Sequence, residues 1–200
     1  MRYLNKIVFI NSAAIRYSEV QLDGNIHLIG TQGVGKSTIL RAILFFYNAD
    51  TQRLGIPVEK KSYQDYYFPY ADSSIIYEVA REDGWFTVLS YKTMNRICYR
   101  FIASPYRPDL FIDEEGAPYP SDRIRSVLDK NGIKYSGAIS TYEEYRNILY
   151  GNSDNKRDYS CYSLMESGSY QNIIRTIQNV LLNSRLEADY IKQTIITSLN

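Results

Sequence analysis

The chain has 200 residues, ordinary apolar content and a formal net charge of +1 at pH 7, which suits one core with at most a small subdomain. The near-zero net charge excludes a global field that attracts nucleic acid, so any such surface must be a local patch. The two cysteines lack metal-ligand spacing, and the start lacks a cleavable signal pattern, so we expect reduced thiols in a cytoplasmic protein. No apolar run has the length of a membrane span, which predicts no membrane partner.

The first 29 residues predict three short strands. Residues 6–10 (KIVFI) form a compact apolar run, and residues 15–22 alternate between apolar and polar. Asp23-Gly24 is a typical hairpin turn, and residues 25–29 follow as the third strand.

Residues 30–37 (GTQGVGKS) match the phosphate-binding pattern G-x-x-x-x-G-K-[ST] at every fixed position. A strand runs into this segment, and the helix-forming run of residues 39–47 runs out of it. Three glycines allow a tight turn whose N–H groups form an anion-binding nest, and the following helix adds its positive end. The sequence therefore predicts a P-loop that binds a nucleoside triphosphate.

The side chains of this P-loop have separate expected roles. Lys36 reaches the β- and γ-phosphates and is the predicted catalytic residue, Ser37 ligates Mg²⁺, and Thr38 donates to the α-phosphate. The other predicted nucleotide-binding residues of the loop are Gly30, Thr31, Gln32, Gly33, Val34 and Gly35.

The order of these elements bears on function. Small GTPases and nucleotide kinases place the P-loop after the first strand of the domain, whereas here two strands and a turn precede it. We therefore expect an α/β fold with α+β character, in which an antiparallel element lies beside a parallel nucleotide-binding sheet.

Residues 48–71 predict a loop with at most one helical turn, in which tyrosines cluster. These rings either stack on a base or pack the loop onto the domain, and packing is the favoured interpretation. Residues 74–80, 85–91 and 96–103 predict an antiparallel meander, followed by a short strand at 110–112. Lys92, Arg96 and Arg100 share parity along the chain, so a strand that continued through them would place them on one face. That face either contacts DNA phosphates or is solvated, and the solvated face is the favoured interpretation.

Asp113 and Glu114 follow a short apolar run and so imitate a strand that ends in catalytic carboxylates. That run has only three residues, and the acidic turn Glu115-Gly116 follows, so we predict an exposed hairpin turn without a catalytic role.

The last third of the chain predicts helices. Residues 121–131 form one, with Ser121 as N-cap, and a capping-box pattern at Ser140 and Glu143 starts another that ends at Gly151. Residues 151–158 form a polar linker and 159–166 a strand. From residue 170 to 199 apolar residues recur at helical spacing.

The opening strand, the second strand, the Asp-Gly turn and HLIGTQGVGKSTILRAI together resemble the N-terminal lobe of SMC-type ATPases of the ABC class, which include SMC proteins, MukB-like condensins and RecF. In that family the loop usually has asparagine where Gln32 stands, and glutamine retains the amide. The resemblance covers residues 1–47 specifically and implies Mg²⁺-dependent ATP binding. It also implies a basic residue near the nucleotide at Arg16 and a Q-loop glutamine, for which Gln171 stands nearest.

The resemblance further implies an N-terminal ATPase lobe at residues 1–168 and the start of a coiled-coil arm at 169–200. The remaining carboxylates and an LSGG-like signature are then expected from the protein's own C-terminal lobe and from the second head of a homodimer, with DNA as partner. The chain alone is expected to be inactive in ATP hydrolysis. A free-standing P-loop NTPase of the AAA or small-kinase type is the alternative, which the chain order disfavours.

Overall fold

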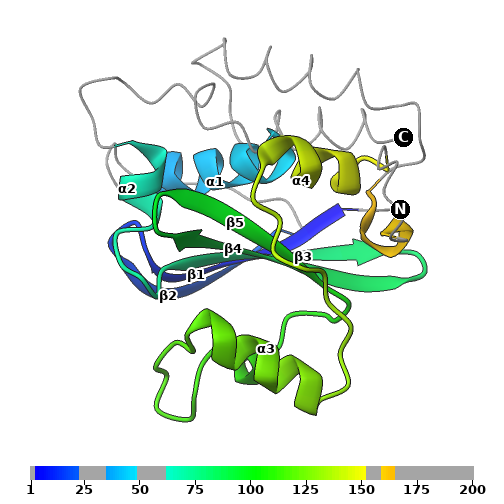
Figure 1. The fold of residues 1–200 in the computed structure, drawn as a ribbon. Helices are drawn as coiled ribbons and strands as arrows, with labels where there is room; N and C mark the ends of the chain where they lie inside the picture. The colour runs from blue at the N-terminus through cyan, green and yellow to red at the C-terminus, as the bar shows by residue number, and fades with distance from the viewer. Residues whose placement is uncertain (1–2, 23–34, 49–61, 152–158, 165–200) are drawn as a thin grey trace.

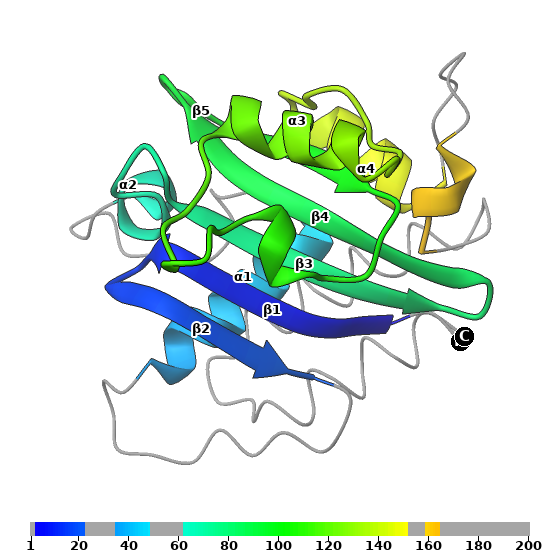
Figure 2. The same ribbon diagram turned by 90° about the horizontal axis from the view of Figure 1, so that it is seen from below.

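The computed structural model describes residues 3–22, 35–48, 62–151 and 159–164 (Figure 1). These residues form a five-stranded sheet with helices on both faces, as the two views of Figures 1 and 2 show. Along the sheet the strand order is β2-β1-β3-β4-β5, and every neighbouring pair is antiparallel. The strands are β1 (Tyr3–Ser12), β2 (Ile15–Gln21), β3 (Ser74–Arg81), β4 (Gly84–Thr93) and β5 (Arg96–Ile102).

The apolar run in β1 exists because both faces of the sheet are covered. Ile7 and Phe9 belong to the core on one face, whereas Val8 and Ile10 belong to the core on the other. A strand that is buried on both sides has no polar alternation, whereas the edge strand β2 retains it. The predicted strands of the meander and the first two strands are confirmed, while the predicted turn at 23–24 and the third strand lie outside the described residues.

Two separate helical layers cover the sheet. On one face lie α1 (Lys36–Asn48), α2 (Tyr63–Tyr67) and α4 (Tyr142–Leu149), and the 3₁₀ turn η3 (Ser160–Tyr162) packs into the same core. On the other face lie η2 (Pro108–Leu110) and α3 (Ser121–Lys130). No helix in this part of the chain is long and apolar enough to cross a membrane.

Two predicted strands are wrong. Residues 110–112 enter from the 3₁₀ turn η2, with Pro108 at its first position, and only Ile112 makes a bridge, to Pro118. The segment predicted as a strand from 159 contains η3, where the Tyr162 ring packs against Phe86 and Phe101 instead of joining the sheet. In both cases a short apolar segment packs against a face of the sheet and does not form one of its strands.

Both predicted helix starts shift by one residue. Pro120 is the N-cap of α3, so Ser121 is its first helical residue. The side chain that caps α4 is Thr141, whose hydroxyl accepts from the Glu144 N–H at 3.2 Å. The sequence STYEE offers a hydroxyl and an acid three residues apart in two registers, and the structure uses the second.

The predicted common face is wrong for Lys92, whereas Arg96 and Arg100 do share one face of β5. Lys92 lies opposite Ile97 in the β4–β5 hairpin, and directly opposed residues share a face, so Lys92 and Arg96 point to different sides. Lys92 Nζ lies 3.7 Å from Asp65 of α2. Arg100 is buried on the α3 side, where Nη1 donates to the Ser136 carbonyl at 2.9 Å, so it is not available to DNA.

Candidate nucleotide-binding site

The described part of the predicted P-loop is its transition into α1. Gly35 has a φ of +74°, a left-handed conformation that side chains disfavour, and no atom of the described residues lies within 4 Å of the place where a Cβ would stand. The Ile39 N–H donates to the Gly35 carbonyl at 3.1 Å, which closes the first turn. The N–H groups of the three residues before Ile39 have no intrahelical acceptor, as at any helix start. This helix end therefore presents donors and a positive dipole to an anion.

Two hydroxyl side chains occupy this first turn. Ser37 is exposed, as a ligand of Mg²⁺ must be, and Thr38 is 8% exposed. Thr38 Oγ1 lies 3.0 Å from the hydroxyl of Tyr66, and the Thr38 carbonyl accepts from the hydroxyl of Tyr67 at 2.6 Å. The open turn and the exposed hydroxyl thus fit a magnesium–triphosphate group, whose Mg²⁺ Ser37 would hold.

The short helix α2 connects this turn to the β1–β2 turn. Ser12 Oγ donates to the Tyr67 carbonyl at 2.7 Å, and Ser62 caps α2 by accepting from the Asp65 N–H at 3.1 Å. The β1–β2 turn is tight, because Ala13 and Ala14 have φ values of +52° and +58°, which non-glycine residues adopt at a cost. Hydrogen bonds through Tyr67 of α2 therefore connect the start of α1 to the β1–β2 turn.

Four tyrosine hydroxyls donate to backbone carbonyls along α1. The pairs are Tyr67 with Thr38, Tyr77 with Ala42, Tyr145 with Phe46 and Tyr150 with Tyr47. Three of these carbonyls are four residues apart, so they lie on one side of the helix. Burial raises the pKa of Tyr67, Tyr77 and Tyr145, so these phenols remain donors at physiological pH. We call these four residues the tyrosine brace.

The tyrosine brace gives a structural role to tyrosines whose role the sequence analysis left open. Within 62–71 the packing interpretation holds for Tyr63 and Tyr67, which are buried, while Tyr66 and Tyr70 remain partly exposed. A high tyrosine content next to a P-loop helix was the only available signal. The acceptor carbonyls carry no sequence signature, so the pairing was not predictable.

The other predicted site residues divide into three groups. Lys36 is the first residue of α1, which begins three residues before the predicted helical run of 39–47. Arg16 is exposed on β2, and in the described ranges no hydrogen bond or ion pair joins it to α1. Residues 30–34 and Gln171 lie outside the described residues.

Asp113 and Glu114 form the predicted turn. The Asp113 carboxylate accepts from the N–H groups of Glu115 and Ala117 at 2.9 and 2.8 Å, and Gly116 adopts a φ of +82°. Glu114 is exposed. The turn follows η2, whose Leu110 packs into the core on the α3 face, across the sheet from α1. The prediction of an exposed turn is confirmed.

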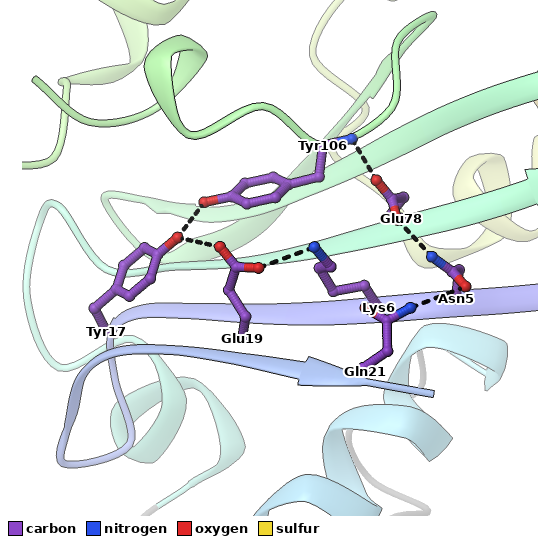
Figure 3. Close-up of polar contacts among 7 residues, drawn as sticks. All are labelled: Asn5, Lys6, Tyr17, Glu19, Gln21, Glu78 and Tyr106. Carbon is purple, nitrogen blue, oxygen red and sulfur yellow. Dashed lines mark hydrogen bonds and ion pairs between the residues drawn. The ribbon is translucent and has the colours of Figure 1, made fainter. Parts of the chain in front are cut away.

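A polar network on the α3 face joins three strands to the segment after β5 (Figure 3). Lys6 Nζ contacts Glu19 at 2.9 Å, and the hydroxyl of Tyr17 contacts both Glu19 and Tyr106. The buried Glu78 carboxylate accepts from Asn5 Nδ2 and from the Tyr106 N–H, each at 2.7 Å.

Both carboxylates in this network have hydrogen-bond donors. Burial opposes ionisation of Glu19, but the hydrogen bonds from Tyr17 and Lys6 and the charge of Lys6 outweigh it and lower the pKa of that carboxyl. Glu78 has a donor on each oxygen. This arrangement is that of a structural network, which fixes the edge strand β2 to β1 and β3.

The comparisons with known proteins give one match. A family model described as "Protein of unknown function (DUF3584)" matches residues 11–200. Searches of curated proteins and of solved structures gave no match. Because the model match spans nearly the whole chain and every element from β2 onward, the chain belongs to the DUF3584 family.

Proposed function

We propose that this chain binds ATP with Mg²⁺ through residues 30–38, as the ATP-binding N-terminal half of an SMC-like ATPase that acts on DNA. One observation carries the proposal: a complete G-x-x-x-x-G-K-S motif runs directly into α1, whose first turn has N–H groups without an intrahelical acceptor and an exposed serine hydroxyl. A glycine-rich turn without a binding role would not need an exposed hydroxyl at the start of a helix that the tyrosine brace holds in place.

The sheet beneath α1 supports the SMC-like form of the proposal. Kinases and AAA-type NTPases lay the P-loop helix on a mainly parallel sheet, as doubly wound folds do. In the described residues α1 covers an antiparallel sheet, with two strands that precede the P-loop. This sheet supports the proposal because the resemblance predicts an antiparallel element in such a lobe; the described residues contain no parallel strand pair, so the expected parallel nucleotide-binding sheet is not among them.

The remaining catalytic groups belong to other parts of the assembly in this proposal. Phosphoryl transfer requires carboxylates that hold Mg²⁺ and orient the attacking water. The candidates that a pattern search selects here, Asp113 and Glu114, lie in a turn across the sheet from α1. We therefore assign those groups to the C-terminal lobe, and the LSGG-like segment to a second head that ATP brings into contact with the first.

Lys36→Ala tests ATP binding. The substitution removes a cation from the phosphate nest, and charge-assisted bonds to phosphate are strong, so we expect a loss of about 2–4 kcal/mol in ATP affinity. Isothermal titration calorimetry with Mg²⁺–ATP measures it. Lys130→Ala is the matched control, because Lys130 is exposed at the end of α3, on the opposite face of the sheet. Equal ATP binding by Lys36→Ala and the unmodified chain contradicts the proposal.

A further inference from the structure

Two adjacent tyrosines of α2 contact the carbonyl and the hydroxyl of Thr38. Tyr67 donates to the Thr38 carbonyl at 2.6 Å, and the Tyr66 hydroxyl lies 3.0 Å from Thr38 Oγ1. The two rings meet edge to face with centroids 4.9 Å apart, and the Tyr67 carbonyl is held by Ser12. The hydroxyl of Tyr66 is therefore placed by a supported ring, not by a mobile side chain.

Tyr66 differs from the tyrosine brace in what it contacts. The brace residues donate to carbonyls, so they hold the helix itself. Tyr66 contacts the side chain of a residue in the first turn, and its own side of the pair faces solvent, because Tyr66 is 38% exposed. The hydrogen bond from Tyr67 to the Thr38 carbonyl already holds α2 against α1, so the contact of Tyr66 with the Thr38 hydroxyl is not needed for packing.

The chemistry of two hydroxyls gives this pair a direction. Each hydroxyl has one proton and accepts through its lone pairs. When Thr38 gives its proton to a phosphate oxygen, its oxygen can only accept from Tyr66. An anion at the start of α1 therefore selects one orientation of the pair, in which Tyr66 donates to Thr38 and Thr38 donates outward.

We propose that Tyr66 is a positioning residue of the nucleotide site, which holds the Thr38 hydroxyl so that its proton points at the α-phosphate of bound ATP. This inference rests on the proposed function. It assigns a role to the exposed side of α2, which neither the P-loop pattern nor the resemblance includes.

Tyr66→Phe in the full chain tests the role. The substitution keeps the ring and removes the donor, and one hydrogen bond of this kind corresponds to about a three- to tenfold loss of ATP affinity. Tyr70→Phe is the matched control, because Tyr70 lies in the same segment and its ring is 64% exposed. We expect the control to bind ATP as the unmodified chain does. Thermal unfolding without nucleotide should be the same for both variants, because Tyr66 is partly exposed.

A second measurement separates positioning from packing. In a Thr38→Val background the hydroxyl that Tyr66 orients is absent, so Tyr66→Phe should cause no further loss of ATP affinity. A packing role of Tyr66 predicts the same loss in both backgrounds, and that result overturns the inference.

The outcomes also distinguish this inference from the proposed function. If the unmodified chain binds ATP and Tyr66→Phe binds it equally, the inference alone is overturned. If the unmodified chain binds no ATP in the calorimeter, both are overturned.

Discussion

Replacing Tyr145 by phenylalanine removes one hydroxyl of the tyrosine brace. That hydroxyl donates to the Phe46 carbonyl at 2.5 Å, and both residues are buried. Because α1 ends at Asn48, the Phe46 carbonyl lies in the last turn and has no N–H donor four residues on within the helix. The tyrosine therefore acts as a C-terminal cap from another helix, in place of the glycine motif that ends many helices.

The expected magnitude follows from the lack of an intrahelical donor to this carbonyl in the described residues. A buried carbonyl that loses its donor costs about 1–3 kcal/mol, whereas a typical net hydrogen bond contributes about 0.5–1.5 kcal/mol. Tyr77→Phe is the matched comparison, since Tyr77 is equally buried and donates at 2.9 Å to Ala42. The Ala42 carbonyl lies within the helix and retains its intrahelical donor. We therefore expect Tyr145→Phe to lower the free energy of unfolding by about 1 kcal/mol more than Tyr77→Phe.

Urea unfolding followed by far-ultraviolet circular dichroism measures both variants. The midpoint should fall while the slope m stays constant, because neither change alters the surface exposed on unfolding. Equal losses for the two variants, or a larger loss for Tyr77→Phe, refute the view that Tyr145 caps α1.

Two other substitutions test residues whose roles the structure revises or confirms. The pair Asp113→Asn with Glu114→Gln should leave ATP affinity in the calorimeter unchanged, because the turn lies across the sheet from α1; a tenfold loss contradicts this placement. Arg100→Met should lower the free energy of unfolding in urea by no more than about 1 kcal/mol, or should raise it. The reason is that a buried charge without a carboxylate partner is costly. In the described ranges Arg100 has only the Ser136 carbonyl and a Tyr135 ring 5.3 Å away, and a loss above about 2 kcal/mol shows that these contacts compensate the charge.

Local sequence patterns determined the elements that neighbouring residues define. The runs of β-branched and aromatic residues in the meander and the tight turn at Gly84 are local features, and they predicted three strands correctly. The P-loop pattern and the apolar run of residues 39–47 likewise predicted a helix after the loop, and α1 begins three residues earlier than that run. Both faces of β1 were buried as its unbroken apolar run indicates, although the second covering layer was not identified.

The tertiary structure alone decided which distant groups meet. The Tyr145 hydroxyl and the Phe46 carbonyl are 99 residues apart, and the acceptor is a backbone atom that every residue has, so no pattern marks the pair. Lys92 and Arg96 were assigned to one face by their parity, but the hairpin between them pairs even with odd positions and reverses that rule. The contact of Tyr66 with Thr38 arises in the same way, because it depends on how α2 packs at the start of α1 and not on either residue's neighbours in the chain.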